Sequence, residues 1–383
     1  MGRAPVFATL LALVAMPCVA AEEPAPGGAD PAAVPEWVRN ISFKGDFRYR
    51  NETIDQQFAG RRNRDRIRVR AGLIASVNDD VRIELGVASS EDNDPRSSNV
   101  TLGGASSRKD INLDLAYFEW RPISALKLRG GKMKYPWERA ASSTLFDGDI
   151  NPEGLAAVWQ RGDFFASAFH HFLDERANAS ESTLQGGQLG WKPSLGAGEL
   201  KVAVGYFDFH RVRGRDPFHG GSANGNTTTG AGCEGGAASC LAFDYDLIGA
   251  FAEYSRPVAG RPLALFADFI ANEAAANGDR TAWSAGLGYG EASTPRTWEV
   301  SYSFQRVDKD AMFGQFLDSD VGGGNTDHRA HVLRAGYAVA KNWIFNVTYQ
   351  LAETDLDVPA DIGGAPVHAR NYERLQLDLN FRF

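Results

Sequence analysis

The chain has 383 residues, of which 43% are hydrophobic, and its mean hydropathy is −0.31. These values exclude a bundle of transmembrane helices but allow a transmembrane β-barrel, because half of each barrel strand is polar. The formal net charge of −8 argues against nucleic acid as the main partner, and 41 glycines with 11% aromatic residues suit an all-β protein with many turns.

The N-terminus reads "MGRAPVFATLLALVAMPCVAAEE". One arginine followed by an apolar stretch from Ala4 to Ala20 predicts a secretory signal peptide over residues 1–21. A membrane anchor is the alternative, but the stretch is short for a span. Residues 22–40 are rich in Pro, Ala and Gly, which predicts a periplasmic linker. Residues 41–383 are left for one large domain.

A two-residue period recurs along this domain. In "ISFKGDFRYR", Phe43 and Tyr49 fall on one face and Arg48 on the other, as in a strand with one apolar and one polar face. We expect sixteen such strands, each long enough to cross a bilayer at a tilt. They cover residues 41–50, 64–77, 81–87, 110–120, 125–135, 154–161, 164–171, 184–192, 199–209, 243–256, 262–272, 280–290, 297–307, 328–340, 343–353 and 371–383.

The connections between these strands alternate in length. Short ones such as "NDD" and "AKN" follow long polar ones such as 53–63, 136–153 and 308–327. The alternation predicts a transmembrane antiparallel β-barrel with short periplasmic turns and long extracellular loops. A soluble sandwich gives no reason for it.

Tryptophans lie beside the short turns. By strand parity Trp159, Trp191, Trp298 and Trp343 share a face with apolar neighbours, which predicts an aromatic girdle at the membrane interface; ordinary core tryptophans are the alternative. Trp120 falls on the opposite face by the same count. The final alternating run "RLQLDLNFRF" ends on Phe383 and resembles the C-terminal signal that the barrel-assembly machinery reads.

Several longer stretches carry a family resemblance. "KGDFRYRNE", "NRDRIRVRAGLIASVNDDVRIELGVAS", "INLDLAYFEWRP", "LKLRGGKMKYPW" and "DGDINPEGLA" resemble the putative porin family of Gram-negative outer membranes, from about residue 41 to the end of the chain. The resemblance implies a barrel pore for small hydrophilic solutes or ions, embedded in outer-membrane lipid and lipopolysaccharide, and analogy with similar pores suggests a homotrimer. It implies no cofactor, and we expect no metal and no nucleic acid.

The polar faces of the first strands are basic. Such a ladder is natural on the wall of a water-filled channel and predicts that fixed charge sets selectivity; a solvated or salt-bridged face without selectivity is the alternative. The predicted wall comprises Lys44, Arg48, Arg50, Arg66, Arg68, Arg70, Arg82, Lys127 and Arg129.

The resemblance also places "DGDINPEG" in a loop that folds into the pore. Asp147, Asp149 and Glu153 are therefore the candidates for an acidic constriction facing the basic wall. Capping of an external turn is the alternative. The basic wall favours anions and the acidic loops favour cations, and we lean slightly towards anions.

Two further loops raise separate questions. Cys233 and Cys240 in a glycine-rich loop predict a disulfide, because exported proteins pass an oxidising compartment; metal binding is the alternative, but no histidine is near. Asp318 and Asp320 lie in a loop whose oxygens could hold calcium, but the EF-hand spacing fails at Arg329, so we expect a solvated acidic loop.

Two other classes of function remain as alternatives. A barrel enzyme would need a compact catalytic constellation, and the histidines here are scattered, with "HHFLDE" from His170 lacking a nucleophile motif. A structural or adhesive barrel without an open pore would show no conductance. We expect a passive channel and not an enzyme.

Overall fold

The structure is a computed structural model that describes residues 40–57, 59–91, 94–218, 222–354, 357–358, 367–368 and 371–383. The predicted signal peptide and, apart from Asn40, the predicted linker lie outside the described residues. Ile41–Phe383 forms one compact unit. Within the described part, no helix is long and apolar enough to cross a membrane.

Sixteen long antiparallel strands form the unit, and each overlaps one strand predicted from the sequence. They are β1 (Ile41–Gln56), β2 (Gly60–Ser76), β3 (Val81–Ser90), β5 (Asp110–Ile123), β6 (Leu126–Lys132), β7 (Glu153–Arg161), β8 (Phe164–Asp174), β9 (Ser182–Trp191), β11 (Gly198–His210), β14 (Tyr245–Val258), β15 (Arg261–Asn272), β16 (Thr281–Gly290), β17 (Trp298–Val307), β18 (His328–Ala340), β19 (Trp343–Thr354) and β22 (Tyr372–Arg382).

Short elements occupy the connections. They are β4 (Val100–Thr101), β10 (Ser194–Leu195), β12 (Thr228–Thr229), β13 (Cys240–Leu241), β20 (Asp357–Val358), β21 (Val367–His368) and the 3-10 turns η5 (Glu234–Gly236), η6 (Gly314–Phe316) and η7 (Val321–Gly324). β12 pairs with β13, and β20 with β21, outside the main sheet.

The sheet closes on itself, so the predicted barrel is confirmed. β1 pairs antiparallel with β22, from Asp46 opposite Arg382 to Gln56 opposite Tyr372. Beyond the strand, the Gly45 N–H donates to the Phe383 carbonyl at 2.9 Å, and the Phe383 N–H donates back at 3.1 Å. Closure leaves no free sheet edge, which is what a sheet in hydrocarbon requires.

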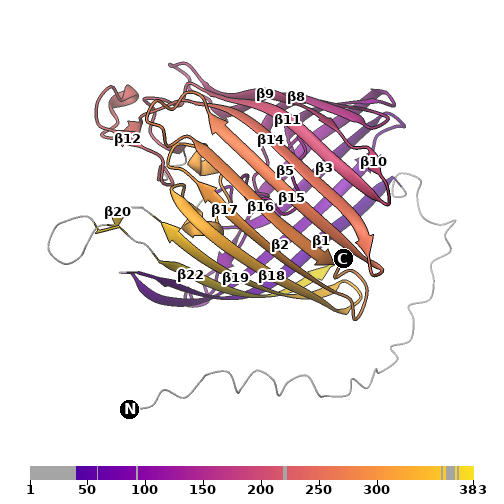
Figure 1. Ribbon diagram of the computed structural model, residues 1–383. Helices are drawn as coiled ribbons and strands as arrows, with labels where there is room; N and C mark the ends of the chain where they lie inside the picture. The colour runs from indigo at the N-terminus through magenta and orange to yellow at the C-terminus, as the bar shows by residue number, and fades with distance from the viewer. Residues whose placement is uncertain are drawn as a thin grey trace, which may run out of the picture. The chain divides into compact units, whose positions relative to one another are not determined.

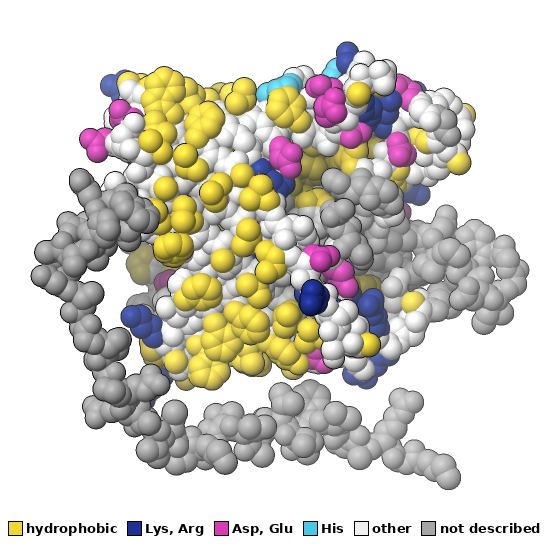
Figure 2. All heavy atoms as spheres, turned by 180° about the vertical axis from the view of Figure 1, so that it is seen from behind, with side chains coloured by type: hydrophobic (Ala, Val, Ile, Leu, Met, Phe, Trp, Pro, Cys, Tyr) yellow, Lys and Arg dark blue, Asp and Glu magenta, His cyan; other side chains and the backbone are white. Residues whose placement is uncertain are grey.

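Apolar side chains face outwards along the strands. On β9 and β11 the outward residues include Leu189, which is 70% exposed, and Val204, which is 55% exposed. Figure 2 shows hydrophobic side chains spread over the side of the barrel, with charged side chains gathered towards its edges. A soluble protein rarely exposes so large an apolar area, whereas a membrane barrel presents an apolar band about 25 Å tall.

Trp120 also faces outwards, contrary to the parity count. In the β3–β5 ladder, Gly86 opposes Leu115 and the next residue, Val87, opposes Leu113, so Asp114 is an inserted bulge residue. The bulge moves the outward positions from odd to even numbers. Trp120 is consequently 44% exposed, and the sequence prediction for it was wrong because a bulge leaves no mark in a two-residue period.

The two ends of the barrel differ as predicted. Short turns, among them 124–125, 162–163, 259–260 and 341–342, gather at one end, and most long connections lie at the other, where Figure 1 shows β12 and β20. We call these the short-turn end and the long-loop end. The predicted long loop 53–63 is wrong: Gln56 pairs with Gly60, because polar residues continue the β1–β2 hairpin past the apolar band.

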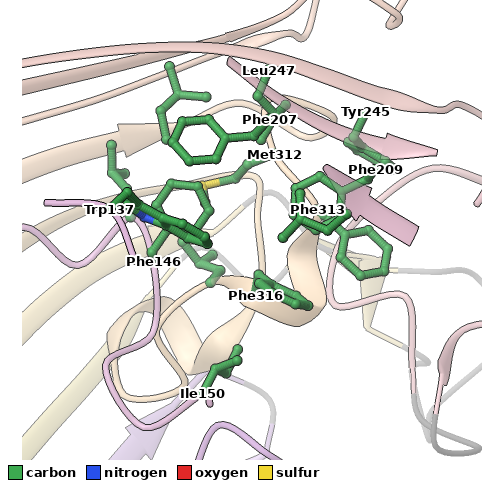
Figure 3. Close-up of a cluster of buried hydrophobic side chains, with 14 of the residues drawn as sticks. Trp137, Phe146, Ile150, Phe207, Phe209, Tyr245, Leu247, Met312, Phe313 and Phe316 are labelled. Carbon is green, nitrogen blue, oxygen red and sulfur yellow. The ribbon is translucent and has the colours of Figure 1, made fainter. Parts of the chain in front are cut away.

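The lumen is partly filled by an apolar core. Long connections between β6 and β7, between β11 and β14, and between β17 and β18 contribute buried side chains that pack on inward residues of β11 and β14. Figure 3 shows Trp137 and Phe146 of the first connection near Phe207, and Phe313 of the third near Phe209 and Tyr245. The open space that remains in the lumen therefore lies beside the opposite part of the wall, which β1, β2, β18, β19 and β22 form.

Candidate permeation site

The connection 133–152 crosses the lumen. Its Glu138 N–H donates to Gln188 Oε1 on β9 at 2.9 Å, and its Ser143 Oγ donates to Asp268 Oδ2 on β15 at 2.6 Å. Thr144 then donates to Gln305 on β17. Because these partners lie on inward faces far apart around the barrel, the segment runs inside the lumen and not over its mouth.

The second half of this segment returns to the basic wall. Asp149 Oδ1 lies 3.4 Å from Arg70 Nη1 on β2, and Asp149 Oδ2 accepts a hydrogen bond from Ser98 Oγ at 3.3 Å. Asn151 donates to Asp114 Oδ1 at 2.7 Å just before β7 begins. Buried Leu145 and Phe146 hold the centre of the segment in the apolar core.

Glu153 does not join the constriction. It begins β7, opposite Lys132 in the β6–β7 ladder, and its Oε1 lies 3.0 Å from Lys132 Nζ. The side chain is exposed on the same face as the outward Leu155. The segment rejoins the wall earlier than the sequence prediction assumed, so placing Glu153 in the acidic constriction was wrong.

The connection 308–327 also enters the barrel, and the predicted solvated acidic loop is wrong. Phe313 and Leu317 are fully buried in the apolar core. Asp320 lies between two wall arginines, with Oδ2 at 2.9 Å from Arg50 Nη1 and Oδ1 at 2.8 Å from Arg374 Nη2. The packing of the apolar side chains and the two ion pairs of Asp320 stabilise the segment inside the barrel more than solvation of its acidic side chains would stabilise it outside.

The two lumenal segments meet at a pair of carboxyl groups. The Ser319 N–H donates to Asp147 Oδ2 at 2.9 Å, and the Asp147 N–H donates to the Phe316 carbonyl at 2.8 Å. Burial and the neighbouring carboxyl of Asp318 raise the pKa of Asp147 well above its usual value. Burial and the charge of Asp320 raise the pKa of Asp318 to about 6.

Asp320 shows the opposite behaviour. Burial alone would raise the pKa of its carboxyl, but Arg374 and Arg50 hold that pKa well below the usual value. Asp320 therefore remains ionised and holds the segment to the wall. Asp318, two residues earlier, forms no ion pair with any described residue, and the nearby charge of Arg334 only partly offsets the rise in its pKa.

The seam between β1 and β22 is also charged on its inner side. Arg50 forms two hydrogen bonds with Asp378, from Nε at 2.7 Å and from Nη2 at 2.9 Å. Arg374 donates to Glu52 Oε2 from Nη2 at 2.6 Å. Asp378, Arg374 and Glu52 were missed as site residues, although the alternation of the last strand already placed Asp378 on the polar face.

The predicted basic wall divides into two groups. Arg48, Arg50, Arg66, Arg68 and Arg70 lie together on the inner face of β1 and β2. Arg82 and Arg129 instead contact buried Glu119, at 3.1 Å and 2.9 Å, with Lys127 on the same face of β6. Lys44 pairs with Glu84 at 2.5 Å. The structure thus brings five of the nine predicted residues to the acidic segments.

Two cavities adjoin this first group. The larger, of about 670 Å³, opens towards the short-turn end and includes Lys134 and Glu291 among its lining residues. The smaller, of about 260 Å³, lies between the lumenal segments and the wall. We call them the vestibule and the chamber. Arg48, Arg68 and Asn346 line both, so the two spaces adjoin along one wall.

The chamber carries both signs of charge. Its lining includes Arg48, Arg50, Arg68, Arg96, Arg334, Asp147, Asp149, Asp318, Asp320 and Asp378. Cations project mainly from the strands, and four of the five carboxylates come from the lumenal segments. Arg96 and Arg334 were missed from the sequence because neither lies in the arginine-rich stretch.

The remaining predicted residues are placed as follows. Cys233 and Cys240 form the predicted disulfide, with 5.5 Å between their Cα atoms. Trp191 and Trp298 are exposed on the outer face, and Trp159 and Trp343 are half-buried on it, all near short turns. Among the described residues, no three His, Cys, Asp or Glu side chains are grouped to hold a metal ion.

Comparison with known proteins decides the family. The family described as "Putative porin" matches residues 56–234 and 224–383, which is most of the chain. The chain belongs to the putative porin family. It is an outer-membrane porin on a closed sixteen-stranded barrel. Among curated protein sequences, none matches this porin.

Solved structures share the barrel fold of this porin. Pseudomonas putida OprB at high pH is 14% identical with a TM-score of 0.60, over 90% of this chain and 95% of that chain. The low-pH structure of the same protein is 12% identical with a TM-score of 0.54, over 90% of this chain and 93% of that chain. An anion-selective porin from Comamonas acidovorans is 12% identical with a TM-score of 0.52, over 90% of this chain and 99% of that chain. At these identities the likeness is one of fold.

Proposed function

We propose that this porin conducts small hydrophilic solutes passively, with selectivity set where the acidic lumenal segments face the arginine wall. One observation carries the proposal: Asp149 lies 3.4 Å from Arg70 and Asp320 lies 2.9 Å from Arg50, where the lumenal segments and the wall border a chamber of about 260 Å³. Opposed rows of fixed charge create a transverse field that orients dipolar solutes and screens ions.

The charge balance of the chamber supports a weak preference for anions. Five arginines and five aspartates line it, so its formal charge is zero when all are ionised. Protonation of Asp147 or Asp318, which their raised pKa values favour, leaves a positive surplus. The anion selectivity of the Comamonas acidovorans porin is a property of that protein, although it fits the same direction.

The cellular context is part of the proposal. Residues 1–21 direct export as a cleaved signal peptide and residues 22–40 serve as a linker, and Phe383 takes part in recognition by the barrel-assembly machinery. The outward Trp159, Trp191, Trp298 and Trp343 form the interfacial girdle beside lipid and lipopolysaccharide. The functional unit is a homotrimer, which native electrophoresis against a cross-linked standard tests.

Reconstitution in planar bilayers tests the channel itself. Stepwise conductance with a measurable reversal potential would support a passive pore, whereas a structural barrel or an enzyme without a pore would give no steps. Changing Arg66, Arg68 and Arg70 together to Ala should shift the reversal potential towards cations. An unchanged reversal potential would remove these arginines from the selectivity mechanism.

A further inference from the structure

Two cations of the chamber lack a full set of partners. Arg334 forms no hydrogen bond or ion pair with any described residue. Arg48 donates from Nε to Asn380 Oδ1 at 2.9 Å, and the carboxylate oxygen paired with it, on Asp378, is 3.8 Å away. Both guanidinium groups therefore keep donors available to a solute.

Two carboxyl groups of the same chamber are held by backbone N–H groups. Asp147 accepts the backbone N–H groups of Asp149, at 2.8 Å, and Ser319, at 2.9 Å. Asp318 accepts the N–H of Asp320 at 2.9 Å. In the part of the chain that the structure describes, neither carboxylate forms an ion pair.

These groups do not form an ion pair with one another, although Arg334 is near enough for its charge to lower the pKa of Asp318. Asp318 belongs to a segment that is held by the Asp320 ion pairs and by buried Phe313 and Phe316, and the Asp147 N–H donates to the Phe316 carbonyl of that segment. The arginines belong to strands β1 and β18. Partly buried charges without partners are costly, which favours a solute that supplies the missing partners.

We propose that the chamber binds a zwitterionic α-amino acid, with its carboxylate at Arg334 and Arg48 and its ammonium group at Asp318, beside the carboxyl group of Asp147. The inference rests on the proposed pore and names the solute class of its constriction. A carboxylate can accept paired N–H bonds from guanidinium groups, and an ammonium group can donate to carboxylates.

Other features of the chamber fit this class better than a sugar or a multiply charged anion. The side chains that line it include no aromatic ring on which a sugar could stack. The chamber presents side chains of both signs, which suits a solute with one charged group of each sign. Asn346 lies beside the free cations, and the amide of buried Gln350 has no partner among the described residues, so hydrogen-bonding capacity remains.

Three small solutes with the same carbon skeleton test the carboxylate-binding end and the ammonium-binding end of the site separately. L-Alanine carries both charged groups, L-lactate replaces the ammonium group with a hydroxyl, and isopropylammonium replaces the carboxylate with a methyl group. In reconstituted full-length porin, L-alanine should block the KCl current saturably, with an affinity about tenfold or more above those of the other two. Equal block by lactate and alanine would reduce the chamber to an anion site and overturn the proposal.

Single variants then assign each end. Arg334→Gln should weaken alanine block about tenfold while leaving isopropylammonium unchanged, and Asp318→Asn should bring alanine and lactate to equal affinity. Arg306→Gln, on the outer face, is the matched control and should leave every affinity unchanged. Retention of wild-type alanine block in both chamber variants would overturn the proposal.

The same recordings separate this inference from the proposed function. Normal KCl steps without saturable block by alanine would reject the amino-acid site and leave the pore intact. Absence of any steps in a barrel that still shows heat-modifiable mobility on gels would reject the pore, and the site with it.

Discussion

Arg50 of β1 and Asp378 of β22 face each other directly across the seam that closes the barrel, joined by two hydrogen bonds of 2.7 Å and 2.9 Å. Both side chains are almost fully buried. Arg50 extends a third bond to Asp320 of the lumenal segment 308–327. The strand closure and the constriction are therefore connected through one guanidinium group.

Loss of Arg50 should destabilise the barrel strongly. Arg50→Gln leaves Asp378 and Asp320 without this partner, and breaking a buried pair costs roughly 3–5 kcal/mol. The temperature at which the native band disappears on gels should fall clearly. Arg329→Gln, which removes an exposed pair with Glu353, is the control and should change it little. Equal temperatures for both variants would contradict the seam's role.

Gly45 should be intolerant of a side chain for reasons of space. A Cβ atom there would overlap the ring of Phe383 and lie 2.8 Å from the Arg70 carbonyl oxygen. Gly45→Ala should therefore displace Phe383 and slow barrel assembly, measured as the rate at which the heat-modifiable form appears in detergent. Gly288→Ala, whose Cβ would make ordinary contacts from 3.8 Å, should assemble at the normal rate.

Ion preference should depend on pH through Asp318. Its pKa, raised to about 6 by burial and Asp320, means that the carboxyl takes up a proton as pH falls through 6. Asp147, Asp149, Asp320 and Arg334 are the other charged groups around it. The reversal potential should shift towards anions between about pH 8 and about pH 5. Asp318→Asn should already show the anion-shifted value at the higher pH, and an identical titration in this variant would exclude Asp318.

The free energy of unfolding should also depend on pH through Asp318, and it should fall as the pH rises. Because the folded pKa of Asp318 lies above its unfolded value, the folded state binds the proton more tightly, and stability declines as pH rises from about 4 to about 6. Asp318→Asn should therefore be more stable than the parent above pH 6 and similar to it below pH 4. Urea titrations at the two ends of this range measure the difference.

The disulfide should protect its loop without affecting conduction. Cys233–Cys240 holds Glu234 beside Arg215, whose carbonyl accepts the Leu241 N–H at 2.9 Å. Closing a loop of this size contributes roughly 2–3 kcal/mol to local order. The Cys233→Ser, Cys240→Ser double variant should be cut faster by trypsin after Arg215, with unchanged conductance. Equal cleavage rates would show that the surrounding hydrogen bonds suffice.

The strands could be predicted from the sequence because burial in a membrane barrel alternates with every residue. The limits of that rule are specific. The bulge at Asp114 reversed the parity of Trp120, and the polar upper part of β1 and β2 carries no apolar signal to separate strand from loop.

The constriction was predicted in part. Family resemblance predicted Asp147 and Asp149 for the acidic constriction, and both line the chamber, but the segment 308–327 was taken for a solvated loop. The acidic residues of this segment predicted exposure to solvent. Phe313, Phe316 and Leu317 instead determine its position, because they enter the apolar core. Sequence alone could not pair Asp320 with Arg50 and Arg374, because 270 residues separate the first two and their meeting depends on barrel closure.

The sharing of Arg50 between the seam and the segment 308–327 has a consequence for biogenesis. In a barrel still open between β1 and β22, Arg50 and Arg374 would not yet be held together on paired strands to bind Asp320. Sealing the cylinder and fixing the lumenal segment in its final position are thus coupled steps of assembly.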